Sequence, residues 1–359
     1  MISSDFFFKI NNYLKDAKVI AYLYTMLFAN FEKLKNFLET PIKIVIIPHQ
    51  NPDGDALGST LALQLFLNKL DHQTSIVSPN DFPDFLKWMP KSDEIIIADK
   101  DFNSAYQAIN KADLICTLDF NHFNRTPILS SLLQKSKSSF LMIDHHISPD
   151  NYAEFQYSDE HMSSTCEMVY NFISAFGEKK YFDKDIATCI YTGMLTDTGS
   201  FKYESATSTS LRIAAELIDL GADKTDIHRK LFDNNSFDRF KLLSCCFKNL
   251  EVIEEKKTAF TFISNEEKEK NNFKKGDTEG FVNYGLSIEN VRFSTIFIEN
   301  KEEQMVKISF RSVGDFDVNQ FARKHFSGGG HKNAAGGKSL LSMEETVKRF
   351  REIINIEHP

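Results

Sequence analysis

Cysteines are few in this sequence, and they are not spaced for metal or redox chemistry. The five cysteines, an odd number, include no CxxC pair, so neither a thiolate zinc site nor a paired disulfide framework is expected. Reduced, buried thiols are typical of cytosolic proteins, in which disulfides are rare. We therefore expect a cytoplasmic protein in which Cys116, Cys166, Cys189, Cys245 and Cys246 are small core residues.

Long hydrophobic runs and an excess of positive charge are also lacking. The apolar stretch at 19–31 is too short to cross a bilayer and has no small-residue cleavage site, so we interpret it as an amphipathic helix and expect no membrane association. The formal net charge is −8 and the pI about 5.7, and no stripe of Lys and Arg stands out. Proteins that grip long nucleic acids usually have a basic face. A nucleic-acid substrate should therefore be short and held locally.

Phenylalanine is abundant, with 33 residues against a single Trp. The phenylalanines are scattered without a periodic stripe, which indicates core filling. The chain of 359 residues is too long for the usual single core, so two domains are expected.

The first part of the chain alternates between strand and helix patterns. After one or two helices predicted over 1–40, residues 42–48 form a β-branched apolar run typical of a strand buried on both faces, and helical spacing follows at 56–70. A strand that leads directly into a helix begins a βαβ unit. Further strands are predicted at 72–79, 94–99, 112–120 and 138–146, and further helices at 164–176 and 185–196. Residues 1–210 are therefore predicted to be an α/β domain with a doubly wound, mainly parallel sheet.

The character of the chain changes beyond this domain. Two helical stretches at 211–220 and 225–249 are predicted to form a connector over 211–249. A smaller α+β domain is then predicted over residues 250–359, with strands at 258–264, 292–300 and 304–312 and a helix at 343–355.

Acidic and imidazole side chains follow hydrophobic runs in four separate segments. They are His49, Asp53 and Asp55 in PHQNPDGDALGS (48–59), Asp119 in LDF, Asp144, His145 and His146 in IDHH, and Asp197 in TGMLTDTGSF (192–201). Three of these segments lie at the carboxyl ends of predicted strands, where open parallel sheets bind their ligands. We therefore expect the side chains to meet in one cleft. Carboxylates crowded in this way repel one another unless cations lie between them.

The ligand types indicate which cations would fit. Asp and His without thiolates favour Mn²⁺, with Mg²⁺ or Co²⁺ as alternatives, over structural zinc. The residues suffice for two ions if one carboxylate bridges them, and two ions about 3.5–4 Å apart can activate a water and clamp a phosphoryl transition state. Taken singly, Asp119 is explained as a cap or turn residue and PDGD as a turn. The combination of segments predicts a two-metal phosphoesterase.

The four segments together resemble the DHH phosphoesterases, a superfamily named after the triplet at 144–146, and the resemblance spans roughly residues 40–355. It implies that one ion is held by His49, Asp53 and Asp119, and the other by Asp55, Asp119, His145 and Asp197. It also implies catalytic roles for the bridging Asp119 and for His146 near the scissile phosphate. Asp144 would orient the histidines.

The segment FSGGGHKNAAGG (326–337) carries substrate information for the second domain. Gly328, Gly329 and Gly330 permit backbone N–H groups to approach an anion closely, although a flexible loop explains the composition equally well. With His331 and an expected small-residue helix start, the segment resembles the signature of the DHH-associated C-terminal domain. This implies that it closes over the metal site and contacts the substrate. Arg311 resembles that family's nucleotide-phosphate anchor, and guanidinium suits phosphate; a solvated surface arginine is the alternative.

These features favour an enzyme of the nanoRNase and phosphoadenosine phosphatase type. Its substrates would be short RNA or DNA oligonucleotides, including dinucleotides, or nucleotide bisphosphates such as 3′-phosphoadenosine 5′-phosphate. A RecJ-like single-strand exonuclease is an alternative, but such chains commonly carry a further nucleic-acid-binding domain. A family II pyrophosphatase is disfavoured by the GGGH segment. A catalytically silent nucleotide sensor would be expected to have lost a metal ligand. The preferred substrate, the cleavage direction, the physiological metal and a homodimer are left open.

Overall fold

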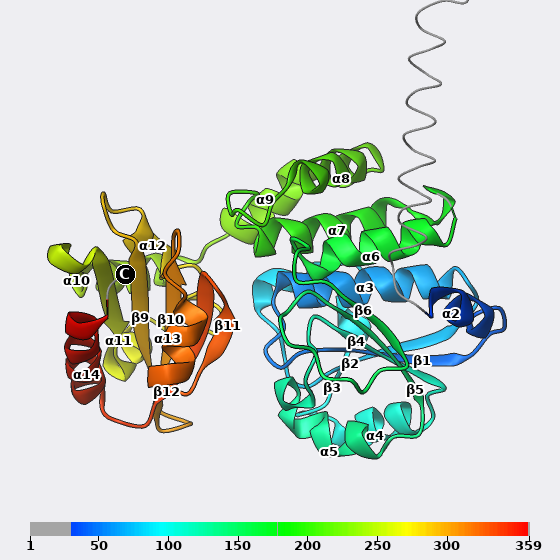
Figure 1. Cartoon of the computed structure of the whole chain (residues 1–359), viewed down its shortest axis with the longest axis horizontal. Helices are drawn as coiled ribbons and strands as arrows, with labels where there is room; N and C mark the ends of the chain where they lie inside the picture. Colours follow the sequence, from blue (N-terminus) through cyan, green and yellow to red (C-terminus); the bar gives the residue numbers. More distant parts are fainter. Residues whose placement is uncertain (1–29, 178, 358–359) are drawn as a thin grey trace, which may run out of the picture. The chain divides into compact units, whose positions relative to one another are not determined.

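The computed structural model describes residues 30–177 and 179–357, which belong to two compact units, Met1–Leu231 and Phe232–Pro359 (Figure 1). The boundary lies within the predicted connector, whose residues are shared between the two units. Helices α8 (Ser208–Asp219) and α9 (Lys224–Phe232) follow the sheet of the first unit, and α10 (Phe237–Lys248) belongs to the second unit. The amphipathic helix predicted over 19–31 falls almost entirely outside the described residues, and α2 (Phe31–Phe37) is the first described helix.

The first unit is built on a six-stranded sheet in which every neighbouring pair is parallel, in the order β3-β2-β1-β4-β5-β6. The strands are β1 (Lys43–Pro48), β2 (Gln73–Ser78), β3 (Ile96–Ile97), β4 (Leu114–Leu118), β5 (Ser139–Asp144) and β6 (Phe155–Ser158). The predicted doubly wound, parallel sheet is confirmed. The short edge strand β6 was not predicted. The order reverses direction between β1 and β4, and this switch point is where such sheets bind ligands.

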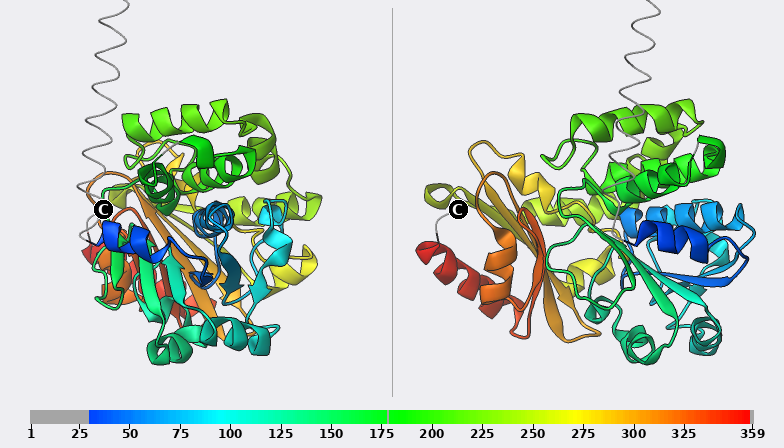
Figure 2. Two further views of the ribbon diagram at one scale, coloured as in Figure 1. Left: turned by 90° about the vertical axis from the view of Figure 1, so that its right-hand side faces the viewer. Right: turned by 45° about the vertical axis from the view of Figure 1, so that its right-hand side comes forward.

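Helices cover both faces of this sheet, as the views in Figures 1 and 2 show. One face carries α3 (Gly54–Asn68), α6 (Thr165–Ala175) and α7 (Lys184–Asp197), and the other carries α4 (Phe102–Asn110) and α5 (Pro127–Lys135). Strand β1 explains the unbroken apolar run: Ile44 and Ile46 join the core on the α3 side, while Val45 and Ile47 join the core on the α4–α5 side. Short 3₁₀ helices are η1 (Asp84–Leu86), η2 (Ser92–Glu94), η3 (Phe123–Arg125) and η4 (Lys179–Tyr181).

The second unit contains a mixed six-stranded sheet in the order β11-β12-β10-β9-β8-β7, with β8 and β9 parallel and the other neighbours antiparallel. Its strands are β7 (Glu251–Ile253), β8 (Thr258–Ile263), β9 (Phe293–Asn300), β10 (Met305–Ser312), β11 (Gly329–His331) and β12 (Ala334–Ser339). Helices α13 (Val318–His325) and α14 (Met343–Ile356) pack on one face, and α10, α11 (Asn265–Lys270) and α12 (Asn283–Leu286) pack on the other, with η5 at Glu254–Lys256.

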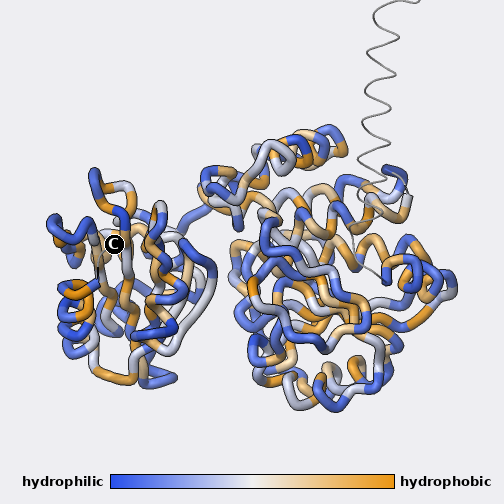
Figure 3. Tube along the Cα trace, viewed as in Figure 1, coloured by the Kyte–Doolittle hydropathy of each residue, from blue (hydrophilic) through white to orange (hydrophobic). Residues whose placement is uncertain are grey.

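Phenylalanine fills the core between this sheet and α13 and α14. Phe260, Phe293, Phe297, Phe310 and Phe350 are fully buried there, many in edge-to-face contact. Figure 3 shows the same pattern in each unit, with hydrophobic positions along the strands and hydrophilic ones along many outer turns. Among the described helices, none has the length and apolar character needed to cross a membrane.

Two local predictions are wrong. The expected helix after GGGH is instead the hairpin of β11 and β12, in which a Cβ on Gly328 would lie 1.9 Å from the Gly336 carbonyl oxygen; small residues here permit close backbone approach. The expected helix over 225–249 is broken at 233–236. There Ser236 caps α10 through the backbone N–H of Arg239, because Asp, Asn and Ser favour caps and turns over helix interiors.

Candidate metal centre

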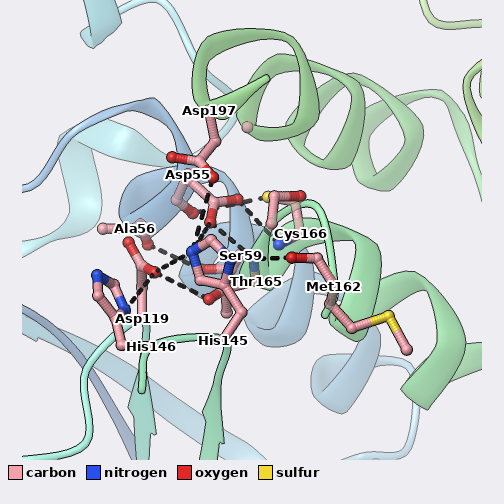
Figure 4. Close-up of polar contacts among 12 residues, drawn as sticks. Asp55, Ala56, Ser59, Asp119, His145, His146, Met162, Thr165, Cys166 and Asp197 are labelled. Carbon is pink, nitrogen blue, oxygen red and sulfur yellow. Dashed lines mark hydrogen bonds and ion pairs between the residues drawn. The ribbon is translucent and has the colours of Figure 1, made fainter. Parts of the chain in front are cut away.

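The predicted site residues of the first unit converge at the carboxyl ends of three neighbouring strands. His49 follows β1, Asp119 follows β4, and Asp144 ends β5, in the sheet order β1-β4-β5. Figure 4 shows Asp55, Asp119 and His145 pointing toward one another, with Asp197 reaching in from the last residue of α7. Segments far apart in sequence therefore meet at the switch point of the sheet.

One group of potential ligands consists of His49, Asp53 and Asp119, with one atom from each lying within 4.8 Å of the others. His49 Nε2 is 3.3 Å from Asp119 Oδ2 and 3.9 Å from Asp53 Oδ2. Its Nδ1 is 2.8 Å from the carbonyl oxygen of Gln50, so this nitrogen carries the proton and donates it. Nε2 is then the nitrogen that faces the carboxylates, as in metal-binding histidines fixed by a backbone carbonyl.

A second group consists of Asp55, His145 and Asp197. His145 Nε2 lies 3.5 Å from Asp119 Oδ1, 3.6 Å from Asp197 Oδ2 and 4.0 Å from Asp55 Oδ2. Its Nδ1 is 3.2 Å from the Met162 carbonyl oxygen and donates to it. Asp119 thus directs Oδ2 toward the first histidine and Oδ1 toward the second, which is the placement required of a bridging carboxylate.

These separations and the donor chemistry fit a pair of divalent cations. Neighbouring ligands at about 2.1 Å from a six-coordinate ion lie about 3 Å apart, so a small contraction of the observed spacings would suffice. The donors are carboxylate oxygens and imidazole nitrogens, the set suited to Mn²⁺ and Mg²⁺. Burial raises the pKa of the neighbouring Cys166 thiol well above its usual value, which argues against a thiolate ligand. The described residues of this cluster therefore fit divalent metal binding.

The electrostatics of the cluster also indicate a need for positive charge. Burial, together with the charges of Asp119 and Asp197, raises the pKa of Asp55 well above its usual value, and desolvation raises the pKa of Asp197 to about 6. Burial would lower the pKa of His145, but the charges of Asp197, Asp119 and Asp55 raise it to about 9. Burial likewise opposes ionisation of Asp119, yet the hydrogen bond from His49 and the nearby histidines hold its pKa well below the usual range. Without metal, protons must supply the missing positive charge.

His146 differs from the other two histidines in its exposure and its partner. Its side chain is 16% exposed, against 6% for His145 and 8% for His49. Its ring Nδ1 donates to Asp144 Oδ1 at 2.7 Å and its backbone N–H donates to Asp144 Oδ2 at 3.0 Å, while Asp144 is fully buried. Asp144 therefore fixes the orientation of the His146 ring through both of its oxygens.

Sequence reasoning missed Thr165, which contacts two of the predicted ligands. Its Oγ1 donates to Asp119 Oδ1 at 2.9 Å and its backbone N–H donates to Asp55 Oδ2 at 2.7 Å. The backbone N–H of Cys166 donates to Asp55 Oδ1 at 2.9 Å. Asp55 thus lies at the N-terminus of α6, where free N–H groups and the helix dipole stabilise a negative charge. In sequence, SST (163–165) resembles any helix N-cap and does not reveal this role.

Three glycines permit α3 and α7 to approach closely at the cluster. A Cβ on Gly54 would lie 2.4 Å from Thr196 Oγ1, and one on Gly58 would lie 2.5 Å from the Cys189 carbonyl oxygen. A Cβ on Gly193 would lie 2.2 Å from Cys166 Sγ and 2.9 Å from Asp55 Oδ1. This close approach is what places Asp55 of α3 near Asp197 of α7.

The remaining predicted site residues lie together in the second unit. Arg311 on β10 and His331 on β11 both pair with Ala334 of β12, so they lie at the same end of the sheet. Gly330 donates its backbone N–H to Asn319 Oδ1 at 3.0 Å, and its φ of 153° lies in a region that favours glycine. Their contact with substrate stays a prediction.

The pKa shifts predict how the stability of the metal-free protein depends on pH. Asp197 and His145 bind protons more tightly when folded, because their pKa values are raised from 3.8 to about 6 and from 6.5 to about 9. The stabilisation that these two protons give the folded protein is complete below the pKa values of the unfolded chain. It is lost as pH rises through the pKa values of the folded protein. We expect the melting temperature in chelator to fall between about pH 4 and pH 9, and the rise caused by Mn²⁺ to grow over the same window, because metal ligands must be deprotonated.

The Asp197→Asn variant supplies the control in thermal melts. In chelator, the melting temperature of this variant should decline less between pH 4 and pH 6.5 than that of wild type. The difference is reduced by solvent screening, because the Asp197 side chain is 26% exposed. Equal slopes for wild type and variant over that window would contradict the assigned shift.

Comparisons with known proteins agree with this geometry. The model of the DHH family, N-terminal domain, matches residues 43–194, and that of the DHHA1 domain matches residues 255–356. The chain is 29% identical to a "Probable bifunctional oligoribonuclease and PAP phosphatase NrnA" of Streptococcus mutans, with 87% of this chain and 94% of that protein covered. It is 28% identical to a bifunctional oligoribonuclease and PAP phosphatase NrnA of Thermus thermophilus, with 88% and 90% covered.

A solved structure is similar over nearly the whole chain. The crystal structure of an exopolyphosphatase-related protein from Bacteroides fragilis superposes with a TM-score of 0.87 at 42% identity, covering 91% of this chain and 96% of that one. Both units described above are thus found in one relative.

Proposed function

The chain belongs to the DHH family, and on that premise we propose that it is a metal-dependent phosphoesterase that hydrolyses short oligoribonucleotides and 3′-phosphoadenosine 5′-phosphate. One observation carries the proposal: two groups of Asp and His ligand atoms lie side by side, and Asp119 directs one oxygen to each group. The relatives named as oligoribonuclease and PAP phosphatase are matched over at least 90% of their length and support the choice of substrates.

We assign the metal ligands from this arrangement. His49, Asp53 and Asp119 would hold one ion, and Asp55, Asp119, His145 and Asp197 would hold the other. The oxygen and imidazole donors favour Mn²⁺, with Mg²⁺ or Co²⁺ as alternatives. When bound, such a pair supplies an activated water and positive charge at the phosphoryl oxygens.

His146 is the chain's own candidate for proton transfer. Its Nδ1–H is engaged by Asp144, whose buried carboxylate would stabilise a positive charge on the imidazole ring. Nε2–H would then donate to a phosphoryl oxygen or to the leaving oxygen as the P–O bond breaks. The greater exposure of His146 supports a role toward substrate, whereas the less exposed His49 and His145 direct Nε2 to the carboxylates.

The second unit would bind the substrate. Arg311 offers a guanidinium group for phosphate, and Gly328, Gly329, Gly330 and His331 offer backbone N–H groups and an imidazole. The net charge of −8 disfavours a long polyanion, because positive charge would be supplied locally by the metals. This supports short substrates over the long single strands of a RecJ-like exonuclease. The presence of all six predicted ligands supports an enzyme over a silent sensor.

A substrate panel tests the function. Purified protein with Mn²⁺ is expected to hydrolyse pApA, pGpG and 3′-phosphoadenosine 5′-phosphate to mononucleotides and phosphate, and to act much more slowly on a long single-stranded RNA and on inorganic polyphosphate. Excess chelator should abolish turnover, and Mn²⁺ should restore it. Efficient, processive cleavage of the long RNA would favour the RecJ-like alternative, and hydrolysis of polyphosphate alone would overturn the nucleotide assignment.

The same panel tests Arg311. The Arg311→Ala variant is expected to raise the KM for pApA by about tenfold or more, the value of a charged hydrogen bond, with little change in Mn²⁺ affinity. Lys307 is an exposed cation on the same strand. The Lys307→Ala variant is therefore the matched control and should leave KM unchanged. A KM unaltered in both variants would return Arg311 to the surface-arginine interpretation.

A further inference from the structure

We propose that Glu167 is a positioning residue that fastens the segment at 162–166 to helix α8, so that α8 sets the affinity of the centre for divalent cations. The inference rests on the proposed function, since it concerns the same metal centre. It adds a buried carboxylate and a helix beyond the predicted ligands to the residues that control the site.

The segment at 162–166 contacts three of the predicted ligands. Its first carbonyl, that of Met162, accepts the Nδ1–H of His145 and so directs Nε2 toward the carboxylates. Its last two backbone N–H groups hold both oxygens of Asp55, and the Thr165 hydroxyl holds Asp119. A displacement of this one segment would therefore disturb both groups of ligands.

Glu167 holds this segment in place through one carboxylate oxygen. Glu167 Oε2 accepts a hydrogen bond from Ser163 Oγ and a second one, at 2.8 Å, from Ser210 Oγ. Glu167 is 4% exposed, and both serines are buried. A buried carboxylate is costly unless its hydrogen bonds are satisfied. Because the buried carboxylate of Glu167 needs both hydrogen bonds, it constrains the positions of Ser163 and Ser210.

Ser210 connects the network to α8. It lies in the first turn of that helix and forms a capping box with Thr207, whose backbone N–H donates to Ser210 Oγ at 3.1 Å. Helix α8 is the first helix after the last predicted ligand in the sequence, and it precedes the segment that leads to the second unit. Movement of α8 would thus be transmitted through Ser210, Glu167 and Ser163 to the ligands.

A pair of variants separates this role from helix capping. Ser210→Ala and Thr207→Ala both destroy the capping box, but only Ser210→Ala removes the bond to Glu167. Mn²⁺ binding is measured on the full chain by the loss of the free-ion EPR signal, which does not depend on catalysis. We expect Ser210→Ala to weaken Mn²⁺ binding about tenfold, the lower end of the loss seen when a hydrogen-bond partner of a metal ligand is removed, because displacement of the 162–166 segment disturbs such partners. Thr207→Ala should leave Mn²⁺ binding close to that of wild type. Equal weakening in both variants would overturn the proposal.

Substitutions of Glu167 itself supply the second test. Glu167→Gln keeps a side-chain oxygen that accepts both hydroxyl groups, so Mn²⁺ affinity should stay near that of wild type, whereas Glu167→Ala should weaken it at least as much as Ser210→Ala. If Glu167→Ala does not fold, the serine and threonine pair still decides. If the wild-type protein does not bind Mn²⁺, the proposed function is contradicted as well. If Ser210→Ala binds Mn²⁺ and hydrolyses substrate as wild type does, only the role of Glu167 is contradicted.

Discussion

Replacing Asp119 with asparagine is expected to lower kcat/KM for pApA by at least about a thousandfold, in keeping with the several kcal/mol that bound metal ions contribute to a phosphoryl transition state. The amide keeps the size of the side chain and can still accept the hydrogen bond from the Thr165 hydroxyl, but it carries no negative charge. One of its atoms becomes an NH₂ donor, which cannot ligate a cation. Because each oxygen of Asp119 faces a different histidine, both ions should bind more weakly.

The experiment compares steady-state hydrolysis and Mn²⁺ stoichiometry in the variant and in a control. Asp150→Asn is the control, because Asp150 is 56% exposed and pairs with His122 at 2.8 Å, outside both ligand groups. It should retain nearly all activity and bind two Mn²⁺ ions. Retention of more than a tenth of wild-type activity by Asp119→Asn would remove the bridging role.

Replacing Gly193 with alanine should disable the enzyme without touching a predicted ligand. The added methyl group would meet Cys166 Sγ at 2.2 Å and Asp55 Oδ1 at 2.9 Å, so α7 and α3 would have to separate. Overpacking of this kind costs about 1–3 kcal/mol of unfolding free energy. Because the shift separates Asp55 from Asp197, we expect kcat/KM to fall about a hundredfold, the cost of a misplacement of roughly 1 Å.

Denaturant melts and kinetics on a small set of variants check this result. Gly336→Ala is the stability control, because its methyl group would meet only the Ile308 carbonyl oxygen, at 3.7 Å. In the double variant Gly193→Ala/Cys166→Ala the sulfur contact is relieved and the contact with Asp55 remains. It should regain more stability than activity. Wild-type activity in Gly193→Ala would show that the helix separation does not control the cluster.

Much of the first unit could be predicted because its strands carry a strong local signal. Strands β1, β4 and β5 are buried on both faces, so nearly every residue in them is apolar, and helical spacing follows β1 at once. Strands β6 and β11 were missed because four and three residues are too short to show a period. The prediction of a helix after His331 was wrong for a different reason. The strands β11 and β12 approach so closely that only small residues fit, and a run of alanine and glycine looks the same in sequence as a helix start.

The convergence of the Asp and His side chains was predicted more completely than the residues that support them. Asp and His residues at strand ends are recognisable because parallel strands bring their carboxyl ends to one edge. Thr165 and Glu167 were missed because a hydroxyl or a carboxylate in the first turn of a helix is common and has many uses. Gly193 was missed because its importance lies in Cys166 and Asp55, which are distant in sequence and approach it only when α3, α6 and α7 pack together.

The sequence by itself determined the residue types of the centre, the strands that carry them and the parallel arrangement of strands that brings their carboxyl ends to one edge. These follow from local hydrophobic pattern and from chain topology, both of which can be read along the chain. Only the tertiary structure decided which oxygen of Asp119 faces which histidine, that the N-terminus of α6 holds Asp55, and that a buried glutamate ties the 162–166 segment to α8. Those relations depend on side-chain directions and on contacts between helices far apart in sequence, which no local pattern encodes.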